Sequence, residues 1–289
     1  MIKTITVAIC YDFDGTLSPF DFFGDDFLSS LGINQMQFWR ECDEQAKMHR
    51  ADPILIRMKL LLDMTRNKEA QITKKALADF GKNIQLYPGL EEWFDRINEY
   101  GWTNKIMVEH YLISSGIKEM IEGSVIQENF KNIFASSYVF DEQGVAIWPA
   151  MAVNYMTKTQ FLLRINKGIT DISNPRSIYS YQPVNQTPIP FSRIIYVGDG
   201  SADIPCMQLV KDRGGHSIVV YAPRHCYKKE GAEVLVGDGL ASFMATADYR
   251  KGKSLDKLIK SVLKSIAMKQ KLEDLEGKKE QINESSFDS

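Results

Sequence analysis

The chain has 289 residues, which suits one large domain with an insertion better than a single minimal core. It is 44% hydrophobic and 25% charged, and 35 basic and 37 acidic residues give a net charge of −2, so nothing in its charge indicates nucleic-acid binding. No apolar stretch has membrane-spanning length, and the N-terminus leads straight into a predicted strand without a signal peptide, so we expect a cytoplasmic protein without a membrane partner.

The first predicted element is a buried parallel strand over residues 5–10, a short run that is β-branched and apolar on both faces. It leads into Asp12-Phe13-Asp14-Gly15-Thr16-Leu17, where two acids precede a glycine turn. The carboxyl end of such a strand faces the crevice where open α/β sheets bind ligands, so Asp12 and Asp14 are candidate catalytic residues. The simpler alternative is a strand-ending acid followed by a common Asp-Gly turn.

Predicted helices then interrupt the alternation of strand and helix. They cover residues 34–50, 53–67 and 73–80. Pro53 suits the first position of the second helix, and apolar residues recur there with a helical period. The alternation resumes at Tyr87-Pro88-Gly89-Leu90, which introduces a helix over residues 91–100. We therefore predict a helical insertion over residues 19–84.

The second predicted core strand covers residues 111–113 and ends in Ser114-Ser115-Gly116. A helix over residues 117–130 follows. A serine hydroxyl and neighbouring backbone N–H groups at a strand-to-helix turn suit an anion such as phosphate. Ser114, Ser115 and Gly116 are therefore candidate phosphate-binding residues.

A β-hairpin is predicted next, with strands over residues 138–141 and 145–148. Lys158 supplies a fixed positive charge just before a helix over residues 159–166. Residues 170–190 are rich in Asn, Ser, Pro and Tyr and have no periodic pattern. They form either a solvated loop or a rim of the site.

The third core strand, residues 193–197, ends in Gly198-Asp199-Gly200-Ser201-Ala202-Asp203. Again an acid ends a buried strand, here between glycines that permit close backbone approach. Acids at the ends of two strands form an oxygen-rich site for a hard divalent cation such as Mg²⁺. The candidate metal ligands are Asp12, Asp14, Asp199 and Asp203.

The last core strands are predicted over residues 218–221 and 234–236. Val236-Gly237-Asp238-Gly239 repeats part of the earlier motif but has no acid four residues after Asp238, so we interpret it as a plain turn. Residues 85–249 thus complete a core domain begun by residues 1–18. Residues 250–289 form a C-terminal helix, packed on the core or on a membrane or partner, and a polar tail from about residue 277 that we expect to be disordered. The widely spaced cysteines predict reduced thiols; they are Cys10, Cys42, Cys206 and Cys226.

With these motifs in this order, the chain resembles the haloacid dehalogenase (HAD) superfamily of phosphohydrolases. The resemblance matches Asp12 to the nucleophile, Asp14 to the general acid/base and Ser114 to the hydroxyl of the second motif. It also matches Lys158 to the lysine of the third motif, and Asp199 and Asp203 to the acids of the fourth. It implies an α/β fold, with a three-layer Rossmann-like core around a parallel sheet and a helical C1-type cap. Phosphoserine-phosphatase-like members have this general layout.

The resemblance implies Mg²⁺-dependent hydrolysis of a small phosphorylated metabolite through an aspartyl-phosphate. A phosphomutase or phosphotransferase would use the same residues, and a non-catalytic binding protein is the remaining alternative. Charged residues of the insertion either contact the leaving group or are solvated on helix faces; they are Arg40, Glu41, His49, Arg50 and Arg57. Its aromatic residues Phe20, Phe22, Phe23 and Trp39 are expected to pack at the junction with the core. The sequence indicates neither the substrate nor the oligomeric state.

Overall fold

The structure is a computed structural model. It describes residues 4–19, 25–66, 71–174, 178, 183, 186–223 and 226–285. Three of the aromatic side chains expected at the junction, Phe20, Phe22 and Phe23, lie outside the described residues. No helix among the described residues is long and apolar enough to cross a membrane.

The predicted α/β class is confirmed by a seven-stranded sheet in the order β4-β3-β2-β1-β5-β6-β7. Its strands are β1 (Ile5–Tyr11), β2 (Ile106–Ile117), β3 (Asn132–Phe140), β4 (Ala146–Met151), β5 (Ile194–Gly198), β6 (His216–Tyr221) and β7 (Phe243–Thr246). All neighbouring pairs are parallel except β3 and β4, which form the predicted hairpin. The chain builds outward from β1 first on one side and then on the other, so a crevice opens at the carboxyl end of β1.

Two hydrophobic clusters, one on each face of the sheet, give the fold its three layers. Val7, Ile9 and Tyr11 of β1 belong to one cluster, and Ala8 and Cys10 belong to the other. The first cluster includes residues of α5 (Trp93–Thr103) and α11 (Ser254–Ser285). The second includes residues of α7 (Lys158–Lys167), α9 (Ile204–Asp212) and α10 (Cys226–Gly237). A strand buried on both faces explains why the sequence of β1 is continuously apolar.

A buried chain of polar side chains lies beneath the end of β1. Trp93 Nε1 donates to Tyr11 Oη (3.0 Å), which lies 3.1 Å from His110 Nδ1. His110 Nε2 lies 3.0 Å from Asn98 Oδ1, an acceptor, so Nε2 carries the proton and Nδ1 accepts from Tyr11. Burial lowers the pKa of His110 to about 3, so the imidazole is neutral in the folded protein.

We expect this histidine to make the protein less stable in acid. As pH falls below about 6.5, the ordinary histidine value, the unfolded chain binds a proton that the folded chain excludes. The free energy of unfolding should therefore fall by up to about 1.4 kcal/mol per pH unit through this group until the folded-state pKa is reached. Urea denaturation between pH 6.5 and 4 should show a shallower fall for His110→Gln than for the wild type. Equal slopes would contradict the assignment.

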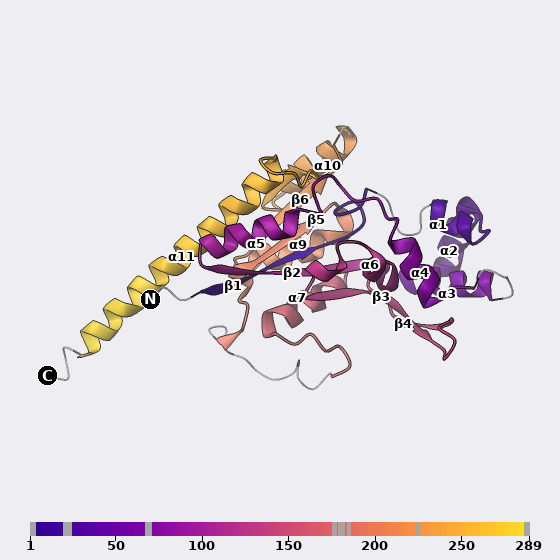
Figure 1. Ribbon diagram of the computed structural model, residues 1–289, viewed down its shortest axis with the longest axis horizontal. Helices are drawn as coiled ribbons and strands as arrows, with labels where there is room; N and C mark the ends of the chain where they lie inside the picture. The colour runs from indigo at the N-terminus through magenta and orange to yellow at the C-terminus, as the bar shows by residue number, and fades with distance from the viewer. Residues whose placement is uncertain are drawn as a thin grey trace.

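The helical insertion contains α1 (Asp25–Ser30), α2 (Gln35–His49), α3 (Pro53–Thr65) and α4 (Lys74–Gly81). Figure 1 shows these helices gathered at one end of the molecule, beyond β3 and β4 and away from the C-terminus. The sequence determines three of their starts, because the side chains of Asn34, Asp52 and Thr73 each accept backbone N–H bonds at a helix N-terminus. The three longer helices match the predicted ranges closely.

Helix α4 of the insertion is fixed to the core through two glycines. A Cβ on Gly81 would lie 2.0 Å from Met120 O of α6 (Lys118–Gly123), and a Cβ on Gly123 would lie 2.1 Å from Ala78 O of α4. The hairpin joins the same region, because Lys74 N donates to Gly144 O (2.9 Å) and Ala146 N donates to Ile72 O (2.8 Å). The backbones of α4 and α6 thus approach closely only because Gly81 and Gly123 lack side chains.

Replacing Gly123 by alanine should therefore lower the free energy of unfolding by about 1–3 kcal/mol, the usual cost of overpacking. The matched control is Gly231→Ala in α10, where nothing lies within 4 Å of a new Cβ. That change should be neutral or stabilising by up to about 1 kcal/mol, because alanine favours helices. Urea denaturation measures both. Two variants of equal stability would show that the crossing tolerates a methyl group.

Three predictions about elements were wrong. Residues 234–236 lie in α10, because parallel strands β6 and β7 require a crossover connection and the helix provides it. The helix predicted over residues 117–130 is divided into α6 and the 3₁₀ helix η1 (Gln127–Asn129). Helix α11 continues to Ser285, so the tail expected to be disordered is helical that far; its residues after 277 include many Lys, Glu and Gln, which are good helix formers. Figure 1 shows α11 extending well past the sheet.

The loop before β5 lies at the end of the sheet opposite the crevice. Thr187, Pro188 and Pro190 line a groove with Thr4 and Ile5 at the amino end of β1. The last residues of the 170–190 segment are therefore not a rim of the site. The first half of α11 packs on the core as expected, with Leu255, Ile259, Val262, Leu263 and Ile266 buried. Cys10, Cys42 and Cys206 are buried free thiols, and the side chain of Cys226 is not among the described ones.

Candidate functional site

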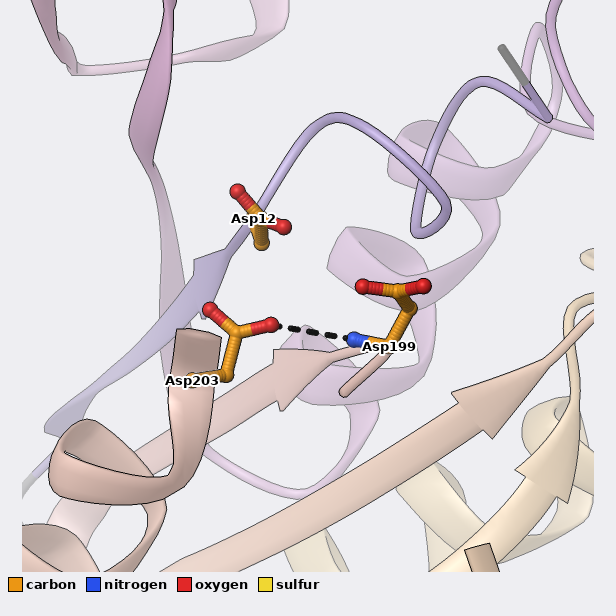
Figure 2. Close-up of side chains that lie close together, drawn as sticks. All are labelled: Asp12, Asp199 and Asp203. Atoms are coloured by element: carbon orange, nitrogen blue, oxygen red, sulfur yellow. Dashed lines mark hydrogen bonds between the residues drawn. The ribbon is translucent and has the colours of Figure 1, made fainter. Parts of the chain in front are cut away.

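Three acids from two strand ends converge at the carboxyl edge of the sheet. Asp12 follows β1, and its N–H donates to Val197 O of β5 (2.9 Å). Asp199 follows β5, and Asp203 ends the short 3₁₀ helix η4 (Ser201–Asp203) before α9. Carboxylate oxygens of Asp12, Asp199 and Asp203 lie within 4.8 Å of one another, and Figure 2 shows the side chains facing a shared space. The predicted convergence of the two motifs is therefore observed.

Two glycines explain why these acids approach so closely. Gly15 has φ +73°, and a Cβ there would lie 2.2 Å from Asp199 Oδ2. A Cβ on Gly198 would lie 2.4 Å from Asp203 Oδ2. The N–H of Asp199 donates to Asp203 Oδ2 (3.1 Å), which holds the turn closed, as the dashed line in Figure 2 marks. A side chain at Gly15 or Gly198 would therefore clash with a carboxylate of the cluster.

Lys158 is the positive centre of this cluster. It is the first residue of α7 and is 1% exposed. Its Nζ lies 2.7 Å from both Asp12 Oδ1 and Asp203 Oδ1. The turn before it is fixed by Asn154, whose Oδ1 accepts N–H bonds from Met156 (2.9 Å) and Thr157 (2.8 Å). Asn154 Nδ2 also donates to Asp52 Oδ2 at the start of α3, so the lysine turn contacts the helical insertion.

The charges of the cluster favour a bound cation. Burial, and then the negative charge of Asp203, raise the pKa of Asp12 above its usual value against the opposing effect of Lys158. Burial and Asp203 likewise raise the pKa of Asp199. Burial lowers the pKa of Lys158, but Asp12 and Asp203 outweigh it and hold that pKa above its usual range. Crowded carboxylates that resist ionisation, with oxygen as the only donor element, fit a hard divalent cation such as Mg²⁺.

Ser114 lies beside Asp12 on the neighbouring strand. β1 and β2 pair in register up to Tyr11 and Leu112, which brings Asp12 level with Ile113 and next to Ser114. The pairing of β2 with β3 shifts between Ser114 and Ile117, and α6 begins at Lys118. The predicted turn at residues 114–116 was wrong, because β2 continues through these residues to Ile117 with an irregular register. The buried Ser114 Oγ accepts the N–H of Gly116 (2.9 Å), so that N–H is already engaged within the irregular end of β2.

Asp14 lies in the loop after β1, is half-buried and forms an isolated β-bridge with Ser18. The N–H groups of Thr16, Leu17 and Ser18 all donate to Phe13 O, which makes this loop compact. A residue from the far end of the chain completes it, because the buried Tyr249 hydroxyl donates to Thr16 O (2.8 Å). The loop carrying Asp12 and Asp14 is therefore stabilised by its own backbone hydrogen bonds and by the hydrogen bond from Tyr249.

The comparisons with known proteins agree with this geometry. No family model matches the chain. An uncharacterized protein of Borreliella burgdorferi is 22% identical over 273 residues, covering 86% of this chain and 93% of that protein. A solved HAD-family hydrolase of Salmonella enterica serovar Typhi has a TM-score of 0.56 and 16% identity to this chain. The match covers 90% of this chain and 71% of the hydrolase chain. A substrate-bound phosphoserine phosphatase has a TM-score of 0.54 and 15% identity, covering 89% of this chain and 98% of its own.

The chain has the HAD fold. Within this HAD core, sequence reasoning missed two side chains that contact the acids. Tyr196 of β5 is buried and donates to Asp203 Oδ1 (2.7 Å); its signal was a hydroxyl within an otherwise aliphatic strand. Lys228 of α10 lies 3.1 Å from Asp199 Oδ2, and no pattern in the sequence marks it.

Other candidates of the sequence analysis are not part of the acid cluster. Asp238 follows the end of α10, where its N–H donates to Val234 O (2.8 Å), and it is not part of the acid cluster. Arg40, His49 and Arg50 are exposed on and just after α2, and Glu41 accepts from Gln45 Nε2 (3.1 Å) on the same helix. Arg57 lies 4.5 Å from the centre of the Trp39 ring, so these two side chains pack together within the helical insertion.

Proposed function

We propose that this protein is a phosphatase that hydrolyses a small phosphomonoester with Asp12 as the covalent nucleophile. The observation that carries the proposal is the placement of Asp12. It ends the central strand of a HAD fold, pairs with a buried lysine and lies within 4.8 Å of two further acids. A nucleophilic carboxylate must be near positive charge to approach a phosphate, and Lys158 supplies that charge 2.7 Å from Asp12.

The proposed metal would be held by Asp12, Asp199 and Asp203, together with the backbone carbonyl of Asp14. When bound, Mg²⁺ supplies positive charge that offsets the phosphate dianion. Lys158 favours the ionised form of Asp12 against the effects of burial and Asp203 and, with the Ser114 hydroxyl, would hold oxygens of the transferring phosphoryl group. Lys158 is the first residue of α7, and Ser114 belongs to β2, the strand that pairs with β1.

The proposed chemistry has two steps. A carboxylate oxygen of Asp12 attacks phosphorus, the bond to the leaving oxygen breaks, and Asp14 donates a proton to that oxygen. Asp14 then takes a proton from the water that cleaves the aspartyl-phosphate, which releases inorganic phosphate and restores Asp12. The helical insertion, residues 19–84, would act as a cap that excludes other water and selects the leaving group.

The experiment is a screen of small phosphorylated metabolites, including phosphoserine because solved phosphoserine phosphatases share the fold. Purified protein with Mg²⁺ should release inorganic phosphate from at least one compound, and EDTA should stop the release. Transfer of the phosphoryl group between positions of a substrate without free phosphate would identify a phosphomutase instead. No phosphate release or transfer with any compound or divalent cation would contradict an enzymatic role.

A further inference from the structure

Two lysines that differ in their exposure to solvent pair with the acids of the proposed metal site. Lys158 contacts Asp12 and Asp203, and Lys228 contacts Asp199 at 3.1 Å. The side chain of Lys158 is 1% exposed, whereas that of Lys228 is 42% exposed. The Lys158 side chain is enclosed by the residues around it. Lys228 is the third residue of α10 and can turn its ammonium group into water.

Asp199 is also the most accessible acid of the three. Its side chain is 20% exposed, compared with 7% for Asp12 and 0% for Asp203. A small pocket lined by Tyr87, Asp199 and Lys228 opens at this side of the cluster. A cation arriving from solvent therefore has an approach to Asp199 on the side where Lys228 lies.

The ammonium group of Lys228 and a divalent cation would compete for the carboxylate of Asp199. They carry charge of the same sign and repel each other at such short range even at the dielectric constant of water. Lys228 compensates Asp199 only as long as no stronger cation takes its place. The exposure of Lys228, and the position of Asp199 at the open side of the cluster, suit an exchange of one cation for another.

We propose that Lys228 is the counter-ion of Asp199 in the metal-free protein and that a divalent cation must displace it from that carboxylate to bind. The inference rests on the metal site of the proposed function and assigns a new residue to it. Lys228 then lowers the affinity of the site for metal while it stabilises the metal-free fold. In this exchange the ammonium group of Lys228 moves from Asp199 into solvent, and no covalent bond is broken.

The test is a Mg²⁺ titration by calorimetry at low salt, without substrate, on the full chain. Lys228→Gln should bind Mg²⁺ about 3- to 10-fold more tightly than the wild type. The matched control is Lys229→Gln, which removes the same charge from the adjacent position, where the lysine pairs with Glu233 (3.1 Å) on its own helix. The control should stay within about 2-fold of the wild type. Lys228→Arg, which keeps the charge, should also resemble the wild type.

A second readout separates exchange from a merely structural role. Without metal, Lys228→Gln should have a lower melting temperature than the wild type, and saturating Mg²⁺ should raise it by more. Unchanged affinity in Lys228→Gln would overturn the inference, and weaker binding would do so too, because it would mean that Lys228 orients Asp199 as a ligand. If the wild type itself binds no Mg²⁺ or Mn²⁺, the metal site of the proposed function fails as well.

Discussion

Replacing Asp12 by asparagine is expected to abolish turnover, with a loss of about 10⁴-fold or more, because the amide cannot attack phosphorus. The fold should survive. Asp12 and Asp203 both contact Lys158, and the charge of Asp203 opposes ionisation of Asp12, so the variant loses a repulsion and keeps the Lys158–Asp203 pair. The free energy of unfolding should therefore be unchanged or slightly higher.

Two measurements check this expectation. Phosphate release from the best substrate of the screen gives the rate, and urea denaturation gives the stability. Beryllium fluoride with Mg²⁺ should bind the wild type as a mimic of the phosphorylated carboxylate and should not bind the variant. Wild-type turnover in Asp12→Asn would show that another group is the nucleophile. A variant that is inactive because it is unfolded would leave no cooperative urea transition, which the denaturation curve reveals directly.

Replacing Lys158 by methionine is expected to remove activity and to cost about 3–5 kcal/mol of unfolding free energy, because it leaves the carboxylates of Asp12 and Asp203 buried without their counter-ion. The loss should depend on pH. Without Lys158 the folded-state pKa of Asp12 rises further above its unfolded value, because the lysine no longer opposes the effects of burial and Asp203. The unfolded chain then releases protons that the folded chain retains, so the variant should become less stable as pH rises from 5 to 8.

Urea denaturation at pH 5 and pH 8, in EDTA, measures this difference. The control is Lys229→Met, which removes an exposed lysine of α10 and should change stability by less than about 0.5 kcal/mol at either pH. Addition of Mg²⁺ at pH 8 should restore part of the loss in Lys158→Met, since the cation replaces the missing positive charge. A loss of the same size at both pH values would contradict the electrostatic explanation.

The parts of the site that the sequence predicted are those governed by local rules. Asp12 and Asp199 each end an apolar run, and the carboxyl ends of parallel strands meet at one edge of a sheet. The joining of the two motifs could therefore be expected before β1 and β5 were seen to pair. The helix starts at Asn34, Asp52 and Thr73 were equally local, because a side chain caps the backbone a few residues ahead.

The parts that were missed depend on contacts between distant segments. Lys228 lies 29 residues after Asp199, in an ordinary charged stretch of helix, so no spacing rule links the two. Val234, Leu235 and Val236 resemble a strand by composition, but the connection between β6 and β7 makes them helical. Gly81 and Gly123 were invisible as a pair, because only the crossing of α4 and α6 brings a backbone carbonyl against each.

The hydrogen bond from Tyr249 to Thr16 has a consequence for how the protein is made. The loop that carries Asp12 and Asp14 leaves the ribosome long before the hydroxyl that completes it, because 233 residues separate Thr16 from Tyr249. A nascent chain that already contains Asp12, Lys158 and Asp203 still lacks this contact. This loop therefore gains its contact with Tyr249 only after the residues of all seven strands of the sheet have been synthesised.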